Sequence, residues 1–545
     1  MVGLLIPILS LVWPPVVEMN YAPMPLPYLE ERPEVIDIDR GRQLFVDEYL
    51  IETTSLERVA HQPKKAEFNP VLKAETETEI GRYGNPGASA KDGGIWWDPK
   101  ARIFKMWYEA GWLQYMAYAE SKDGIHWDRP KLDLMPGTNV IIPDIPADSS
   151  TAWLDLFTDD SSQRYKMFLR SPNSVPGSKE KYTTGWCLVS GDGIHWDKRV
   201  PTGPCGDRST MFYNPFREKW VFSLRNSGNV NKVSIGRHRM YHESSDFLEG
   251  ASWTKEGLAF WLGADSLDAP DPLIGDKPQL YNLSAVAYES IMIALPQIHL
   301  GPSNGKCKEL GKPKITELKV AYSRDGFHWD RRDRDVFIAA SRKDGFWDKG
   351  YVQSVGGLCN IVGDELWFHY IGFSGNGGML DSVYEFNGMH YGGATGMAVL
   401  RRDGFVSMEA GQEAGELLTR PVRFSGKYLF VNTDCPDGQL QVEVLDAGGN
   451  TLKGFEMAAC KAVKKNSTIT RVGWRGKGSL AALAGKPVRF RFRLQNGALY
   501  SFWVSPSTKG ESNGYTAACG PGFTGGTDTV GLKGWKKARK YQINQ

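Results

Sequence analysis

Short apolar runs separated by turn-forming residues fill the chain from about residue 86 to residue 415. Residues 95–108 hold two such runs around Asp98-Pro99, and residues 211–222 hold two around Asn214-Pro215. Each has the pattern of a β-hairpin. A second hairpin follows, in which a run such as Met116-Ala-Tyr-Ala119 leads through Asp-Gly to a tryptophan. The pattern therefore predicts units of four strands.

Three of these second hairpins are nearly identical. They read Ser121-Lys-Asp-Gly-Ile-His-Trp127, Ser190-Gly-Asp-Gly-Ile-His-Trp196 and Ser323-Arg-Asp-Gly-Phe-His-Trp329. Degenerate copies stand at residues 243–246 and 401–404, so the Asp landmarks lie roughly 70, 55, 80 and 80 residues apart. Five copies of a four-stranded unit predict a five-bladed β-propeller over residues 86–415, because blades packed around an axis hide their sheet edges.

The hydrophobic pattern changes after residue 404. Tyr428-Leu-Phe-Val431, Leu440-Gln-Val-Glu-Val-Leu445 and Val488-Arg-Phe-Arg-Phe-Arg-Leu494 alternate apolar and polar residues. Such strands bury one face only, which is typical of a β-sandwich. We therefore expect an all-β chain: an extended strap over residues 31–85, the five-bladed β-propeller, a C-terminal β-sandwich over residues 420–505, and a loop or tail over residues 506–545.

The composition agrees with this prediction. A chain of 545 residues needs at least two cores. Its 60 Gly, 18 Trp, 22 Tyr and 24 Phe suit short strands and tight turns. The net charge of +2, without a long basic stripe, argues against binding of nucleic acid. The basic cluster at residues 536–540 is interpreted as a solvated end.

The N-terminal residues suggest export. The apolar stretch from Val2 to Val17 contains Pro7, Pro14 and Pro15, and is too short and interrupted to span a membrane. We expect residues 1–30 to be a leader and the protein to be secreted or periplasmic. The seven cysteines show no metal-binding spacing. His126, His195 and His328 belong to separate units, so packing over each hairpin explains them better than a shared metal site.

Carboxylates open the innermost strand in three successive units. Alignment of the first hairpins places Asp92, Asp148 and Asp207 at equivalent positions. The inner strands of a propeller line an axial funnel, so these side chains are expected to converge at its mouth. Cleavage of a glycosidic bond needs two such carboxyl groups. The alternative is that these residues cap turns. Asp98 and Asp155 fall at hairpin turns and are expected to be structural.

Cations and aromatic residues accompany these carboxylates. Arginine pairs carboxylates bidentately, so a group of arginines near one rim suits an acidic sugar, although surface ion pairs explain them equally well. Two tryptophans near the mouth are candidates to stack on sugar faces or to pack between blades. The expected substrate-binding residues are Arg208, Arg225, Arg237, Arg239, Trp112 and Trp347, with Arg170 beside them.

With these carboxylates, the chain resembles the five-bladed propeller glycosidases of families 32 and 43 over roughly residues 85–415. Lys91-Asp92-Gly-Gly stands where family 32 carries its nucleophile motif, Gly206-Asp207-Arg208 where it carries Arg-Asp-Pro, and Tyr288-Glu289-Ser290 nearest its acid/base. None of the three motifs is intact. The opening residues 41–50, followed by residues 69–72, also look like uncharacterised bacterial relatives annotated by similarity to family 32.

The resemblance implies hydrolysis of a terminal sugar, furanosidic or acidic. Asp92 would be nucleophile or base, Asp207 would orient the sugar, and Glu289 or Asp148 would protonate the leaving oxygen. The internal alignment instead places Glu289 at a hairpin turn, which leaves Asp148 or the loop over residues 265–271 as the acid. No redox cofactor is implied. Analogy with family 43 allows a structural Ca²⁺ in the axial channel, which nothing in the sequence requires.

Two rival functions remain at this point. The same rim of polar and aromatic residues suits a carbohydrate-binding propeller that does not cleave its ligand. The Ser-x-Asp-Gly-x-His-Trp hairpin also resembles the Asp-box of sialidases, although its glycine stands elsewhere. An arginine triad with a tyrosine nucleophile would favour that reading. A carbohydrate partner is expected in every case, whereas the sequence leaves the oligomeric state open.

Overall fold

The computed structural model describes residues 13–81, 85–171, 184–230, 233–310, 312–375 and 387–543, so part of the expected leader, residues 1–12, lies outside the described residues. The prediction of an all-β chain is confirmed. Within these ranges no helix has the length and apolar content needed to cross a bilayer. The α-helices are short: α1 (Pro27–Glu30), α2 (Glu77–Ile80), α3 (Asn304–Leu310), α4 (Asn387–His390) and α5 (Leu532–Ala538).

Five groups of mostly antiparallel strands follow one another along the chain. The first two are β6 (Gly87–Asp98), β7 (Ile103–Ala110), β8 (Tyr115–Ser121) and β9 (Val140–Ile142), then β10 (Thr151–Leu154), β11 (Tyr165–Arg170), β12 (Thr184–Ser190) and β13 (Lys198–Pro204). The third is β14 (Thr210–Asn214), β15 (Lys219–Val230), β16 (Val233–Ser244) and β17 (Ala259–Gly263).

The fourth and fifth groups recruit strands from distant parts of the chain. They are β18 (Gln279–Glu289), β19 (Ile291–Gly301), β20 (Ile315–Leu318), β21 (Ala321–Ser323) and the distant β33 (Tyr515–Thr516), then β22 (Gly350–Val362), β23 (Glu365–Phe373), β24 (Gly393–Arg401) and the distant β5 (Lys64–Lys65). A parallel pairing of β24 with β6, from Gly393 to Gly87, joins the fifth group to the first.

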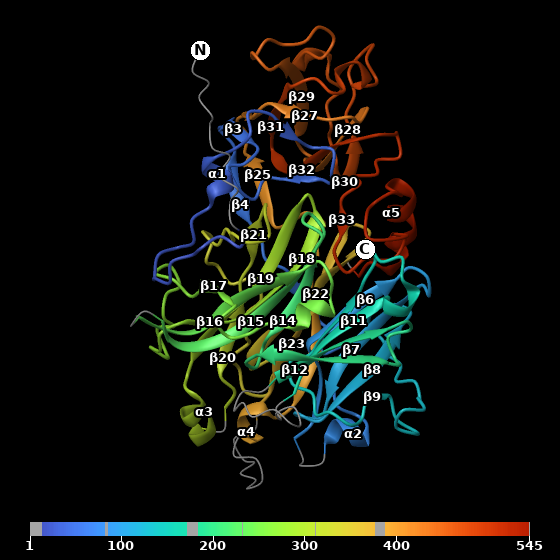
Figure 1. Cartoon of the computed structure of the whole chain (residues 1–545). Helices are drawn as coiled ribbons and strands as arrows, with labels where there is room; N and C mark the ends of the chain where they lie inside the picture. The colour runs from blue at the N-terminus through green and yellow to red at the C-terminus, as the bar shows by residue number, and fades with distance from the viewer. Residues whose placement is uncertain are drawn as a thin grey trace, which may run out of the picture.

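The first strands of the five groups contact one another in a ring. β6 contacts β10 and β22, β14 contacts β10 and β18, and β18 contacts β22. The starts of these strands lie toward α2, α3 and α4, at the end of the molecule opposite the C-terminal sheets (Figure 1). We call this end the mouth. The ring thus brings residues from five separate segments of the chain around one axis.

The repeated Asp-Gly hairpins share one hydrogen-bond pattern. In the first, Ser121 Oγ accepts a bond from the Gly124 amide at 2.8 Å, and Asp123 Oδ1 accepts from the next two amides. His126 Nδ1 lies 2.8 Å from Asp123 Oδ2. The other two copies repeat these contacts. Each repeated histidine therefore pairs with the aspartate of its own hairpin.

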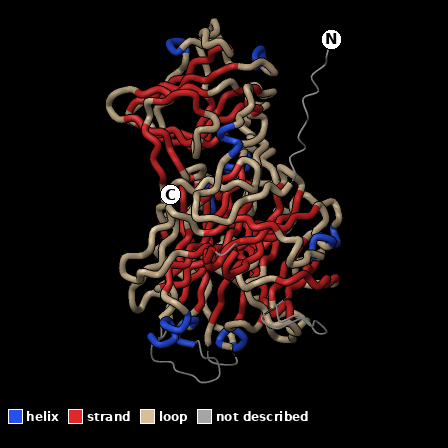
Figure 2. Tube along the Cα trace, turned by 60° about the vertical axis from the view of Figure 1, so that its left-hand side comes forward, coloured by secondary structure: helices blue, strands red, loops and turns tan. Residues whose placement is uncertain are grey.

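Two further sheets stack at the far end from the mouth (Figure 2). One contains β1 (Ile36–Asp37), β3 (Ile51–Thr54), β26 (Gly415–Thr419), β27 (Val422–Arg423), β29 (Gln439–Asp446) and β31 (Val488–Gln495). The other contains β2 (Gln43–Leu44), β4 (Glu57–Ala60), β25 (Val406–Ala410), β28 (Tyr428–Asp434), β30 (Asn466–Arg471) and β32 (Gly497–Ser505).

The inward faces of these two sheets form a hydrophobic core distinct from that of the ring. Val442, Val444, Phe490, Phe492 and Phe502 belong to it and are buried. Four of the strands, β1 to β4, come from the segment for which the sequence predicts only an extended strap. The N-terminal segment is thus part of the two-sheet unit.

The C-terminal segment packs against the ends of the inner strands. The Ala517 and Ala518 amides donate to the carbonyls of Ala287 in β18 and Cys359 in β22, at 3.1 and 3.0 Å. The Ala518 carbonyl accepts from the Trp97 amide of β6 at 3.1 Å. Residues 515–520, for which the sequence predicts a loop or tail, therefore close the ring opposite the mouth.

This closure requires a glycine at position 520. A Cβ there would lie 1.8 Å from the backbone carbonyl oxygen of Ile361, which cannot move aside. We expect Gly520→Ala to lower the Tm, consistent with a loss of about 1–3 kcal/mol from overpacking. Gly525→Ala is the matched control, because a Cβ there meets no atom within 4 Å. Equal melting temperatures for the two variants would contradict the tight closure.

Candidate functional site

A distortion in β6 places two charged residues at the mouth. The pairing of β6 with β7 shifts register between Ser89 and Gly94, and Asp92 has a φ of 54°. A Cβ at Gly93 would lie 1.9 Å from the Trp107 carbonyl oxygen, and one at Gly94 would lie 2.2 Å from that of Ala152. The glycines thus allow the backbone to bulge between its neighbours, and the consecutive Lys91 and Asp92 enter two different clusters.

Asp92 is sealed in the first cluster. Its Oδ2 lies 2.6 Å from Arg208 Nη1, and its Oδ1 accepts from Asn282 Nδ2 at 2.7 Å. Both side chains of the ion pair are 0% exposed. Burial raises the pKa of Asp92 to about 6, although Arg208 acts in the opposite direction. Arg208 directly follows Asp207 in the sequence. The cation that pairs with Asp92 is therefore the chain neighbour of the next carboxylate of the site.

Lys91 holds the second cluster. Its ammonium forms ion pairs with Asp148, which opens β10, and with Glu109 of β7 at 3.3 Å. Arg170 of β11 also pairs with Asp148. Although burial opposes them, Lys91 and Arg170 hold the pKa of Asp148 below its usual range. Burial raises the pKa of Glu109 to about 7, despite Lys91. The Lys91 ammonium therefore contacts one carboxyl group whose pKa is raised and another whose pKa is lowered.

Asp207 faces solvent more than the other carboxylates. Its side chain is 30% exposed and pairs with Arg225. Its Oδ2 accepts from the Tyr281 hydroxyl at 2.8 Å. Asp207, Arg225 and Arg170 line a cavity of about 390 Å³. Because Arg170 also contacts Asp148, the second cluster borders this cavity.

The structure therefore brings three of the predicted carboxylates to one end of the ring. Asp92, Asp148 and Asp207 lie in or just before β6, β10 and β14, and each pairs with a different arginine, Arg208, Arg170 and Arg225 respectively. Burial of Asp92 corrects one expectation: Arg208 and Asn282 occupy its oxygens and shield it from solvent, so a sugar cannot reach them in this arrangement.

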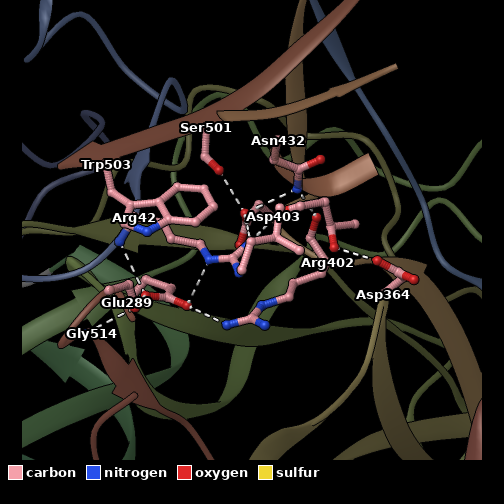
Figure 3. A network of polar contacts seen from close by, with 12 residues as sticks. Arg42, Glu289, Asp364, Arg402, Asp403, Asn432, Ser501, Trp503 and Gly514 are labelled. Atoms are coloured by element: carbon pink, nitrogen blue, oxygen red, sulfur yellow. Dashed lines mark hydrogen bonds and ion pairs between the residues drawn. The ribbon is translucent and has the colours of Figure 1, made fainter. Parts of the chain in front are cut away.

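Glu289 lies elsewhere, which corrects the placement implied by the family resemblance. It follows Tyr288 at the turn between β18 and β19, the end of the inner strand away from the mouth. Its carboxylate accepts from Arg402 at 3.0 Å and pairs with Arg42 at 3.4 Å (Figure 3). It also accepts from the Ser512 hydroxyl at 2.7 Å. The internal alignment of the repeats, which places Glu289 at a hairpin turn, agrees with this position.

The network around Glu289 joins distant segments. Arg42 also pairs with Asp403 at 3.0 Å, and Asp403 accepts from Ser501 at 2.6 Å (Figure 3). All these charged side chains are nearly or fully buried. Glu289 thus helps to attach the ring to the two-sheet unit.

The remaining predicted residues differ in their proximity to the mouth. Arg237 stacks over Tyr281, 4.9 Å from its centroid, and Trp112 lies 4.2 Å from the Lys91 ammonium. Arg239 is buried and donates to the carbonyls of Arg208 and Tyr281. Trp347 packs against Tyr370 of β23 instead of the charged clusters.

The expected alternative acids also have structural partners. In the loop over residues 265–271, Asp268 pairs with Arg331 at 2.8 Å, Asp265 pairs with Arg334 at 2.9 Å, and Asp271 pairs with Arg342. At the hairpin turns, Asp98 binds Arg164 at 2.6 Å and Asp155 binds Lys166 at 2.7 Å. These contacts give each of the five carboxylates a stabilising role.

Calcium requires six to eight oxygen ligands. Within the described ranges, no three His, Cys, Asp or Glu side chains gather in a group able to hold a metal ion. No cluster of such side chains for the structural Ca²⁺ that the resemblance allows is therefore found among the described residues.

Sequence reasoning missed Lys91, Glu109, Tyr281 and Lys314 as members of the site. A signal for Glu109 was present: in the second strand of three successive units an apolar run is followed by a charged residue, at Glu109, Arg170 and Arg225. This repeated position faces the mouth in each group. Lys314 carries no comparable signal, because it lies in a connection and not in a repeated strand.

No protein-family model matches the sequence, and no curated protein is significantly similar to it. Among solved structures, an N-acetylgalactosamine deacetylase from F. plautii is similar with a TM-score of 0.41 and 14% identity, covering 64% of this chain and 96% of that one. A fructofuranosidase from Schwanniomyces occidentalis gives 0.36 and 10%, covering 82% and 98%. A thermostable family-43 glycoside hydrolase gives 0.37 and 11%, covering 59% and 93%.

Glycoside hydrolases are thus among the structures to which the chain is similar. Similarity at this level leaves chemistry open, so the function must follow from the residues of the mouth.

The sealed ion pair of Asp92 and Arg208 gives a stability prediction. Asp92→Ala leaves a buried guanidinium without its carboxylate, and breaking such a pair costs about 3–5 kcal/mol. We therefore expect a clearly lower Tm than in the wild type, measured by differential scanning calorimetry. Asp159→Ala is the control, because Asp159 is exposed. A Tm unchanged in both variants would show that the pair contributes nothing to folding.

Proposed function

We propose that this protein is a five-bladed β-propeller glycoside hydrolase with a C-terminal β-sandwich, and that it cleaves a terminal sugar bound at the mouth of the ring. The observation that carries the proposal is the pair of carboxyl groups on Lys91. Pairs whose surroundings drive their pKa values apart are the hallmark of acid and base assignments in glycosidases. Glu109 and Asp148 form such a pair. Arg170, which pairs with Asp148, lines a cavity of about 390 Å³ beside them.

The surroundings suggest a role for each group. Glu109, whose pKa is raised to about 7, would give its proton to the leaving oxygen. Asp148, kept ionised by Lys91 and Arg170, would act as base or nucleophile. Asp207, held by Arg225 and Tyr281, would orient the sugar at the cavity. Asp92 would act through Arg208 as a positioning residue.

Tyr281 favours a second candidate from the same class of enzyme. Its hydroxyl bonds a carboxylate, and Arg237 stacks on its ring. A tyrosine nucleophile paired with an acid, beside arginines, is the arrangement that the sialidase-like alternative requires. Loss of activity in Tyr281→Phe with full activity in Asp148→Asn would favour this candidate.

The first test removes the proton donor. We expect Glu109→Gln to lower kcat by about 10²- to 10⁴-fold, the usual contribution of general acid catalysis. Asp148→Asn should lose at least as much. Turnover of a panel of aryl glycosides and oligosaccharides measures both, with the exposed Glu256→Gln as control. Binding of glycans without turnover by the wild type would instead support the carbohydrate-binding alternative.

The second test uses pH. Glu109 must be protonated to act as an acid, so kcat/KM should fall about tenfold per pH unit above about 7, where its folded-state pKa lies. Asp148 must be ionised to act as base or nucleophile, so kcat/KM should decrease on the acid side only below the usual titration range of an aspartate. Any residual activity of Glu109→Gln should lack the alkaline limb. A wild-type profile flat from pH 6 to 9 would exclude Glu109 as the donor.

A further inference from the structure

Cations outnumber carboxylates at the mouth. Lys91, Arg208 and Arg225 each pair with a carboxylate of the clusters described above. Arg237 and Lys314 differ from them, because in the part of the chain that the structure describes their side chains contact an amide oxygen and aromatic rings, and no carboxylate. Arg237 donates instead to the amide oxygen of Gln279 at 2.9 Å. The site therefore holds positive charge that its own residues leave uncompensated.

Lys314 is the buried member of this uncompensated pair. It precedes β20, and only 2% of its surface is exposed. Its ammonium lies 4.6 Å from the centroid of Tyr351 and 5.3 Å from that of Tyr281, and no hydrogen bond or ion pair to it exists among the described residues. Burial, with Arg237 nearby, lowers its pKa to about 7. An unpaired buried ammonium is costly, and pairing with an anion removes that cost.

His299 adds unused polar atoms to the same place. Its ring lies 5.8 Å from that of Tyr281, is 3% exposed, and has no hydrogen-bond partner for either nitrogen within the described chain. Burial, with Arg237 and Lys314 nearby, keeps its pKa well below the usual value, so the ring is neutral and has one N–H to donate. Lys314, Arg237 and His299 together offer several donors without bound acceptors.

Tyr281 connects this cluster to the proposed sugar site. Its hydroxyl donates to Asp207, which lines the cavity, while its ring contacts both Lys314 and Arg237. A ligand held at Asp207 would therefore extend one substituent across Tyr281 toward the free donors. A neutral hydroxyl there would leave the ammonium uncompensated, whereas a carboxylate or sulfate would neutralise it.

We infer that the sugar bound by this protein carries an anionic substituent, a carboxylate or a sulfate, which binds Lys314 and Arg237 beside Tyr281. The inference rests on the proposed function for its choice of the mouth as the sugar site. It narrows the substrate class to acidic sugars.

The test measures binding of D-glucuronate, glucose 6-sulfate and D-glucose to the full chain by isothermal titration calorimetry. The variants are Lys314→Met and the conservative Lys314→Arg. Lys312→Met is the matched control, because it removes the same charge from an exposed residue of the same segment. Lys314→Met removes a buried unpaired charge, so its Tm should equal or exceed that of the wild type.

We expect the wild type to bind glucuronate or the sulfate at least tenfold more tightly than glucose. Charge-assisted hydrogen bonds of this kind correspond to roughly 10- to 100-fold in affinity. Lys314→Met should lose that preference, Lys314→Arg should retain part of it, and Lys312→Met should keep all of it. Tighter binding of glucuronate would identify a carboxylate site, and tighter binding of glucose 6-sulfate would identify a sulfate site.

Two results separate this inference from the proposed function. If the wild type cleaves neutral glycans and binds glucuronate, the sulfate and glucose equally, the anion site is refuted while the hydrolase stands. If the anionic ligands bind in a Lys314-dependent manner but Glu109→Gln leaves every measured activity unchanged, the anion site is supported while the hydrolase proposal fails.

Discussion

The close approach of the inner strands constrains the whole molecule. At the axis, β6 lies so near β7 and β10 that Gly93 and Gly94 have no room for a side chain. Gly356 of β22 meets the same limit, because a Cβ there would lie 2.3 Å from the Gly93 carbonyl oxygen. Contact this tight lets the five inner strands converge around one axis. It also forces β6 to bulge, and the bulge directs the side chains of the consecutive Lys91 and Asp92 into two different clusters.

Burial and charge pairing explain the behaviour of the mouth. The carboxyl groups of Asp92 and Glu109 are both driven toward the neutral form by burial, whereas Asp148 is held ionised by two cations. Carboxyl groups at the same end of the ring therefore acquire different proton affinities. The cations near Tyr281, Lys314 and Arg237, have no carboxylate partner among the described residues. In the inference above, an anionic ligand supplies the missing negative charge.

Local sequence patterns predicted the strands well. The Asp-Gly hairpins and their tryptophans recur with the same bonds, since every contact lies within seven consecutive residues. The positions of Asp148 and Asp207 followed from aligning those units. Glu289 showed the limit of family resemblance, because the motif match implied a place at the funnel whereas the alignment of the repeats placed it at a hairpin turn, where it lies. Contacts between distant segments, such as β1 to β4 in the two-sheet unit, leave no pattern in the short strands themselves.

The ring is closed by residues that lie on both sides of it in the chain. β5, encoded before the first inner strand, pairs with β24, and residues 515–520, encoded after the last, bond to β6, β18 and β22. During synthesis the inner strands therefore leave the ribosome long before the peptide that caps them. Until residues 515–520 emerge, the ends of these inner strands lack their hydrogen-bond partners, and unpaired strand ends of this kind favour aggregation.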